Sequence, residues 1–191
     1  MKTAQKKFVV VGAGQVGGLI AQRLAARGDD VVVVSRSPRS IAGARHVARD
    51  VLVDALDDVV AGAAAVFVAV NAPYSARVWA ATLPRLQARV DGATVAAGAR
   101  LVVLENLYVH GPQTAPLRED TPFSTSTKKG AVREQMTRAL FARKHELRVA
   151  AVRPPDFWGP SLHGALLDDK ALRGIVAGKA VQAVGDLDVD H

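Results

Sequence analysis

The most constraining feature of this chain is a glycine-rich hexapeptide, GAGQVG, which directly follows a short apolar run at residues 8–11. Gly12 permits a tight turn off a strand, and Gly14, having no Cβ, lets a ligand approach the backbone. Gly17 allows the following helix to pack close to that strand. A turn of this kind at a helix N-terminus predicts a seat for a diphosphate, although a purely structural turn is the competing interpretation. The residues of this predicted seat are Gly12, Gly14, Gln15, Val16 and Gly17.

Short apolar runs and longer helical patterns alternate along the rest of the chain. The runs that predict strands lie at residues 8–11, 31–34, 66–70, 101–104 and 148–152, and residues 50–53 lie at or just after a weaker one. The helical patterns lie at residues 15–27, 56–61, 76–97, 128–145 and 166–177, and a long loop is expected over 106–127. The alternation predicts a Rossmann-type α/β fold, a doubly wound parallel sheet flanked by helices. Pro84 lies inside the third helical pattern, so we expect a kink or two helices there.

The end of the second predicted strand bears on the choice between NAD and NADP. Sites specific for NAD place Asp or Glu there to bind the ribose 2′-hydroxyl, whereas this chain reads VSRSPR over residues 34–39. Arg36 can stack on adenine and pair with a 2′-phosphate, and Ser35 or Ser37 can hydrogen-bond it. We therefore expect NADP as the cofactor, with NAD as the alternative. The competing interpretation makes Arg36 and Arg39 solvated surface arginines.

Composition excludes several other kinds of site. The chain has 191 residues and no cysteine, which rules out disulfides, thiolate metal sites and a cysteine nucleophile. Its five histidines show no metal-ligand spacing, so we expect no metal. The net charge of +7 comes from dispersed Lys and Arg, which favours a general attraction for anions over a nucleic-acid partner. No apolar stretch reaches the length of a membrane span, and we expect a cytoplasmic protein.

Several further segments occur in a specific order. They are VVVGAGQVGG at 9–18, the pair Asp50-Val51, VFVAVNAPYSARVW at 66–79, LVVLENLYVHGP at 101–112, TKKGAVRE at 127–134 and VRPPDFWGP at 152–160. In their joint order and spacing they resemble the atypical and extended short-chain dehydrogenase/reductase proteins, the NAD-dependent epimerase/dehydratase group.

The resemblance implies roles for residues that follow the strands. Asp50 would accept a hydrogen bond from the adenine amino group, with Val51 packing nearby. Asn71 and Ala72 would line the cofactor, and Pro154 would shape the nicotinamide pocket. The alternatives are that Asp50 caps a turn and that Asn71 satisfies loop backbone.

The resemblance also implies that Lys129 is the active-site lysine, which binds the nicotinamide ribose. Members with dehydrogenase chemistry usually carry Tyr-x-x-x-Lys, but the residue four before Lys129 is Thr125, and the residue four before Lys128 is Ser124. Neither can act as a phenol-type acid near neutral pH. Tyr108 is the local phenol that can stand in as the catalytic partner, and its alternative is a packed loop aromatic.

We thus expect residues 1–160 to form an NAD(P)-binding Rossmann domain and residues 161–191 to begin an incomplete, truncated C-terminal substrate-binding region. Apolar surface over residues 162–184 would then stay partly uncovered and favour a homo-oligomer. The expected function is an NAD(P)-dependent oxidoreductase or an epimerase/dehydratase-like protein, acting on a small-molecule carbonyl, alcohol or sugar-like substrate. The alternative is a non-catalytic NADP-binding sensor or remnant fragment, which the missing active-site tyrosine favours.

Overall fold

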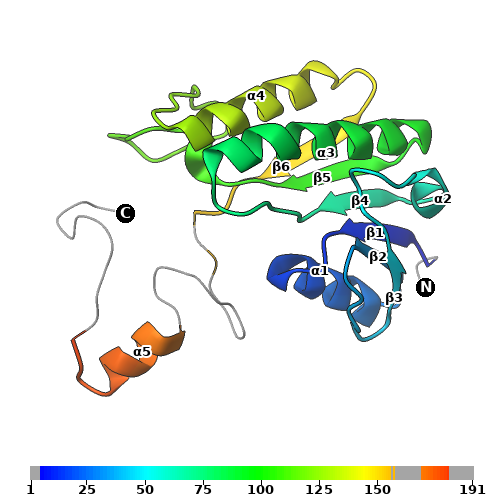
Figure 1. Cartoon of the computed structure of the whole chain (residues 1–191), viewed down its shortest axis with the longest axis horizontal. Helices are drawn as coiled ribbons and strands as arrows, with labels where there is room; N and C mark the ends of the chain where they lie inside the picture. Colours follow the sequence, from blue (N-terminus) through cyan, green and yellow to red (C-terminus); the bar gives the residue numbers. More distant parts are fainter. Residues whose placement is uncertain (1–4, 156, 158–168, 181–191) are drawn as a thin grey trace. The chain divides into compact units, whose positions relative to one another are not determined.

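The computed structural model describes residues 5–155, 157 and 169–180, and within them six parallel strands form one sheet. The strands are β1 (Lys7–Val11), β2 (Asp30–Ser35), β3 (Ala44–Ala48), β4 (Ala65–Val68), β5 (Arg100–Leu104) and β6 (Arg148–Val152). Their order across the sheet is β3-β2-β1-β4-β5-β6, as Figure 1 shows. This is the strand order of doubly wound dinucleotide-binding sheets, so the predicted Rossmann-type fold is confirmed.

The crossovers between these strands contain α1 (Gln15–Ala26), α2 (Asp57–Val60), α3 (Ala76–Ala96), the 3₁₀ turn η1 (Leu107–Val109) and α4 (Lys128–Ala142). A further helix, α5 (Asp169–Val176), follows β6. The C-cap of α1 is Arg27, and Gly28 follows with a φ of 86° and donates its N–H to the Ala25 carbonyl, a common way for a helix to end. α4 is three residues shorter than predicted, and η1 lies inside the segment expected to be loop.

The expectation of two helices around Pro84 is wrong, because α3 runs through it as a single helix. Proline removes one backbone N–H and crowds the carbonyl of Ala80, one turn earlier. Ala80 is exposed, so water can satisfy that carbonyl. Leu83 and Leu86, only 2% and 7% exposed, lie on either side of Pro84 and hold the helix against the protein. Tertiary packing therefore overrides the local preference.

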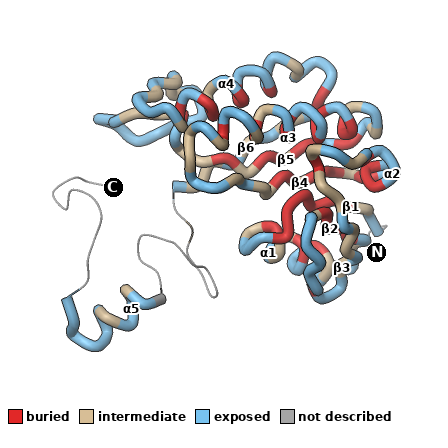
Figure 2. The backbone as a smooth tube through the Cα atoms, in the orientation of Figure 1, coloured by how far each residue is buried: buried red, intermediate tan, exposed pale blue. Residues whose placement is uncertain are grey.

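Apolar side chains fill both faces of the sheet, as expected from the unbroken valine runs. Alternate residues of β1 belong to different faces: Val9 packs on the side of α2 and α3, whereas Val10 packs on the side of α1. Figure 2 shows the resulting buried band along the central strands, between helices that are exposed on their outer sides. The layers thus hold the carboxyl ends of β1, β2 and β4 together at one edge.

The strands that follow β1 lie on both sides of it in the sheet. The chain runs outward through β2 and β3 on one side and then crosses to β4 on the other. The loops after β1 and β4 therefore diverge, and such a switch point is where ligands bind in open α/β sheets.

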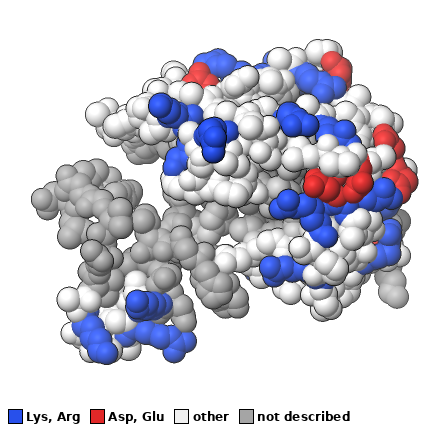
Figure 3. Space-filling model, viewed as in Figure 1, with Lys and Arg blue, Asp and Glu red and all other residues white. Residues whose placement is uncertain are grey.

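Contacts divide the chain into two units, Met1–Arg153 and Pro154–His191. About half of the segment 162–184, where uncovered apolar surface was expected, lies outside the described residues, but on α5 Ile175 and Val176 are 52% and 90% exposed. In the first unit, Lys and Arg are scattered over the face shown in Figure 3. None of the helices in the described ranges is long and apolar enough to cross a membrane.

Candidate functional site

The glycine turn between β1 and α1 requires its glycines for different reasons. Gly12 has a φ of 109°, and a Cβ there would lie 2.7 Å from the carbonyl oxygen of Ala69. A Cβ on Gly17 would collide with the carbonyl oxygen of Gly12, so the first turn of α1 rests directly on the loop. Around Gly14, in contrast, a Cβ would meet nothing within 4 Å. The tight turn and the close helix packing are thus observed, and Gly14 faces open space.

The N-terminus of α1 is built to receive an anion. Its N-cap is Gly14, which has no side chain to accept a hydrogen bond from the first-turn N–H groups. The helix also begins without an acidic residue in that turn, so the positive end of its dipole is not neutralised. Gln15 and Val16 belong to this turn. This arrangement of N–H groups and dipole favours a phosphate.

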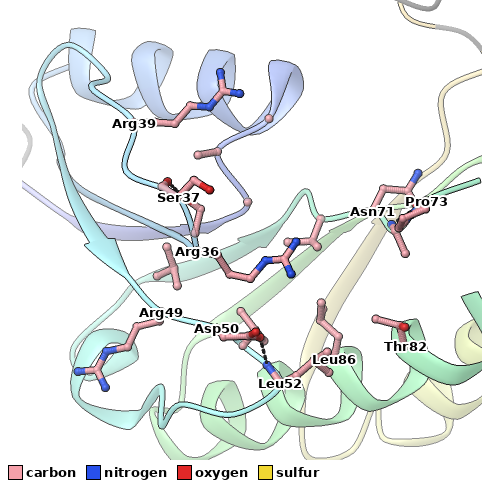
Figure 4. Close-up of a pocket in the computed structure, with 18 of the residues that line it drawn as sticks. Arg36, Ser37, Arg39, Arg49, Asp50, Leu52, Asn71, Pro73, Thr82 and Leu86 are labelled. Carbon is pink, nitrogen blue, oxygen red and sulfur yellow. Dashed lines mark hydrogen bonds between the residues drawn. The ribbon is translucent and has the colours of Figure 1, made fainter. Parts of the chain in front are cut away.

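A cavity of about 490 Å³ opens beside this turn. Figure 4 shows its walls, which come from the glycine turn, the end of β2, the segment after β3, the segment after β4 and one side of α3. The cavity brings together the predicted residues Gly12, Gly14, Ser35, Arg36, Asp50, Val51, Asn71 and Ala72. Gln15, Val16 and Gly17 lie behind the turn and are not part of its lining. Pro154 is the first residue of the second unit.

The β2 end of the cavity is cationic. Arg36 is exposed, and its guanidinium points into the cavity (Figure 4). The Ser35 hydroxyl donates to the Ser37 carbonyl at 2.8 Å and lies 2.8 Å from Nε2 of His46. With its only proton donated to Ser37, this hydroxyl accepts from His46, which therefore carries its proton on Nε2. Ser35 thus shapes the turn that carries Arg36.

The segment after β3, next to the end of β2, forms another wall of the cavity. Oδ1 of Asp50 accepts the N–H of Leu52 at 2.9 Å, which closes an Asx turn, and the Asp50 N–H donates to Asp54 at 2.7 Å. Asp50 therefore does cap a turn, and it also lines the cavity. Val51 packs beneath it and is 6% exposed.

Arg89 of α3 holds this turn in place, and the sequence pattern did not indicate it. Its guanidinium donates to three backbone carbonyls in one turn, those of Val51, Val53 and Asp54. The guanidinium thus supplies a hydrogen-bond donor to all three of these backbone carbonyls. A long-range contact of this kind has no local signature in the sequence.

The segment after β4 connects the cavity to a second group of side chains. Oδ1 of Asn71 accepts the N–H of Ala72 at 2.9 Å and Nη2 of Arg133 at 3.2 Å. The carbonyl of Ala72 accepts Nε1 of Trp79 at 3.2 Å. Arg133 is 4% exposed, and its guanidinium lies 4.7 Å from the centroid of the Trp79 ring. Burial lowers the pKa of Arg133, whereas the charges of Glu105 and then Tyr108 oppose that effect.

The second group consists of three aromatic rings and Lys129. The Trp79 and Tyr108 rings stack with centroids 5.9 Å apart, and the Tyr74 ring meets both edge-on. The hydroxyls of Tyr74 and Tyr108 are 2.8 Å apart. The ammonium of Lys129 lies over the Tyr74 ring, 3.0 Å from its centroid. We call these four residues the phenol cluster.

Lys129 reaches the cluster because the start of α4 packs tightly onto η1. Thr127 caps α4 by accepting the N–H of Gly130 at 2.9 Å. A Cβ on Gly130 would collide with the Thr125 hydroxyl and the Tyr108 carbonyl, so only glycine allows this approach. Thr125 is thus a packing residue at the position where the resemblance would place a tyrosine.

Tyr74 is the site residue that sequence reasoning missed. The Lys129 ammonium, and then the Tyr108 hydroxyl, lower the pKa of Tyr74 below its ordinary value, against the opposing effect of desolvation. The available signal was its place just after a buried strand, at the edge where ligands bind. Because Tyr74 and Lys129 lie far apart in the chain, no spacing rule connects them.

The end of β5 is occupied by a structural ion pair. The Glu105 carboxylate accepts Nε of Arg153 at 2.7 Å and the Thr137 hydroxyl at 2.8 Å, and its side chain is 2% exposed. Asn106 caps η1 by accepting the N–H of Tyr108.

Fold and glycine turn together define the class of protein: this is an NAD(P)-binding Rossmann fold. A family model described as NADP oxidoreductase coenzyme F420-dependent matches residues 7–91, which is less than half of the chain. No curated protein matches the sequence.

Solved structures with this fold include a 4-epimerase and other proteins in complex with NAD. WbmG of Bordetella bronchiseptica in complex with NAD is 18% identical with a TM-score of 0.74, over 93% of this chain and 62% of that one. UDP-glucuronic acid 4-epimerase from Bacillus cereus in complex with NAD is 14% identical with a TM-score of 0.73, over 91% and 64%. MoeE5 in complex with UDP-glucose and NAD is 24% identical with a TM-score of 0.69, over 82% and 56%. The chain therefore spans about 56–64% of the length of these proteins. They agree with the resemblance to epimerase/dehydratase enzymes at the level of the fold.

Proposed function

We propose that this protein is an NADP-dependent oxidoreductase or epimerase-like enzyme acting on an alcohol, a carbonyl or a sugar-like substrate. The observation that carries the proposal is a single cavity with a phosphate seat at one wall and the guanidinium of Arg36 at another. The phenol cluster adjoins it through Asn71 and Ala72.

The residues present fit a nicotinamide dinucleotide. The open space around Gly14 and the uncapped start of α1 suit a diphosphate. The cavity volume of about 490 Å³ lies in the range of pockets that hold cofactors and other small ligands. The Asp50 carboxylate would accept the adenine amino group, and Val51 would support the ring. Asn71 and Ala72 would line the nicotinamide side.

The preference for NADP rests on the charge at the end of β2. Arg36 offers a planar set of donors that matches a phosphate, and no carboxylate among the cavity-lining residues of that turn competes for it. Ser35 already donates its proton to the Ser37 carbonyl, so Arg36 is the main candidate for recognising a 2′-phosphate, with Arg39 beside it in the cavity lining.

The bound cofactor would supply hydride transfer at the nicotinamide carbon. The substrate class is supported by the neighbours, because WbmG was crystallised with NAD and UDP and MoeE5 with UDP-glucose and with UDP-glucuronic acid. By analogy with these ligands, we propose a sugar-like alcohol or ketone as the substrate of the present chain.

A fluorescence titration with NADPH and NADH tests the cofactor assignment. Arg36→Met is expected to weaken NADPH binding by about tenfold or more, because a charge-assisted bond to phosphate contributes about 1.5–3 kcal/mol, and to leave NADH binding unchanged. Arg23→Met removes the same charge from an exposed position on α1 outside the cavity, and serves as the matched control. Equal loss for both cofactors would defeat the NADP assignment, and no binding of either would defeat the proposed function.

Turnover distinguishes an enzyme from a non-catalytic sensor. UDP-glucose, UDP-glucuronic acid and simple ketones are suitable probes. NADPH oxidation or NADP⁺ reduction reports oxidoreduction, and a change in the sugar of the product reports epimerisation, which regenerates the cofactor. Binding of NADPH without turnover of any of them would select the sensor.

A further inference from the structure

We propose that Tyr74 is the acid–base residue of this site, taking the substrate hydroxyl proton on its phenolic oxygen, with Lys129 and Tyr108 as the residues that position and stabilise its phenolate. This inference rests on the proposed function, and it assigns the role to a loop residue after β4.

Geometry favours Tyr74 over Tyr108 for this role. The Lys129 ammonium lies 3.0 Å from the centroid of the Tyr74 ring. The Tyr108 ring instead stacks on the buried Trp79 ring, and its hydroxyl meets that of Tyr74 at 2.8 Å. Tyr74 therefore has a cation and a hydroxyl beside it, and both stabilise a negative charge on its oxygen.

Access to a substrate also favours Tyr74. Its side chain is 67% exposed, compared with 36% for Tyr108. Pro73, its neighbour in the chain, lines the cofactor cavity. A phenol in this place can contact a molecule bound at the mouth of that cavity while its ring stays held against Trp79.

The electrostatics point the same way. Lys129 first, and Tyr108 second, lower the pKa of Tyr74 from its ordinary value near 10. A general base works best when its pKa lies near the operating pH, and burial alone would shift a phenol in the wrong direction.

Tyr74 and the cofactor together account for the proton and the hydride that leave the substrate. In the oxidising direction the Tyr74 phenolate would take the proton of the substrate hydroxyl, while the carbon that bears this hydroxyl would lose its hydride to the bound nicotinamide cofactor and become a carbonyl carbon. In the reducing direction Tyr74 returns the proton to the carbonyl oxygen. Lys129 keeps its proton throughout, so its charge favours the phenolate in both directions.

Ultraviolet pH titration of the tyrosinate band tests the assignment without cofactor or substrate. The chain contains only two tyrosines, Tyr74 and Tyr108, so each ionisation step can be assigned. The wild type is expected to show one step below the ordinary tyrosine pKa, and Tyr74→Phe is expected to remove that step. If the low step survives in Tyr74→Phe, or if the wild type shows no low step, the proposal is overturned.

Two lysines that adjoin on α4 provide a matched pair of variants. Lys129→Met is expected to move the low step towards the ordinary pKa, and Lys129→Arg to restore part of the shift. Lys128→Met removes an equal charge one residue away and is expected to leave the step in place. An identical shift in Lys128→Met and Lys129→Met would show that the effect is general charge and would overturn the role of Lys129.

Binding and turnover together separate this proposal from the proposed function. Tyr74→Phe is expected to bind NADPH as the wild type does and to lose about 100-fold or more in turnover, the range for removing a general acid–base group. If the wild type binds NADPH and Tyr74→Phe turns over equally fast, the acid–base role fails while the cofactor assignment stands. If the wild type binds NADPH and turns over none of the probes, the role fails as well.

Discussion

Nη2 of Arg89, on α3, donates to the backbone carbonyl of Asp54 at 2.6 Å and thereby ties a helix to the loop after β3. That loop carries Asp50, the carboxylate proposed to meet adenine, and the same guanidinium also binds the carbonyls of Val51 and Val53. The wall of the cavity at the adenine end is therefore held from outside by a residue that does not line it.

Arg89→Met should loosen this wall. We expect NADPH binding to weaken by about tenfold, the effect typical of losing an outer residue that orients a binding group. Titration of NADPH fluorescence measures it, and Arg85→Met on the exposed side of the same helix is the control. Equal affinities of the Arg89 and Arg85 variants would contradict the positioning role.

Two adjacent glycines of α1 should respond to alanine in opposite directions. Gly17→Ala places a Cβ against the Gly12 carbonyl, and overpacking of this kind costs about 1–3 kcal/mol. Gly18→Ala meets nothing within 4 Å and should stabilise the helix by about 0.5–1 kcal/mol. Denaturant unfolding compares the two variants. The packing argument is wrong if Gly17→Ala is as stable as Gly18→Ala.

The Glu105–Arg153 pair should matter far more than a surface pair. Glu105→Gln removes a charge that is 2% exposed and leaves Arg153 partly buried without its counter-charge, at an expected cost of about 3 kcal/mol. Glu134→Gln breaks the i,i+4 pair with Arg138, whose arginine side chain is 63% exposed, and should cost less than about 1 kcal/mol. The free energy of unfolding of each variant is the measurement, and similar losses would refute the difference.

Asp91 should make stability depend on pH. Burial raises the pKa of Asp91, against opposing effects of the Gln87 hydrogen bond and the Arg143 charge. The folded state thus binds this proton more tightly, so stability is fully present below the unfolded pKa of about 3.9 and is lost as pH rises through the raised folded pKa. Asp91→Asn should then be more stable than the wild type at neutral pH, with the difference vanishing in acid. Asp30→Asn, at an exposed aspartate, should show no such trend in the same unfolding series.

Local sequence patterns were sufficient to predict the sheet and the glycine turn. The valine runs, the glycine spacing and the helical periodicity act over a few residues, and the strands and the turn occur where they were predicted. The expectation of two helices failed at Pro84, where packing against distant segments decided and the burial of Leu83 and Leu86 keeps α3 in one piece.

The sequence by itself determined a doubly wound sheet with a glycine turn at its switch point, because periodicity and the lack of a Cβ are properties of neighbouring residues. Tertiary structure alone decided that Arg89 holds the loop around Asp50 and that Lys129 lies over Tyr74. Those contacts join segments 35 or more residues apart, and only the crossover helices of a parallel sheet bring them to one edge.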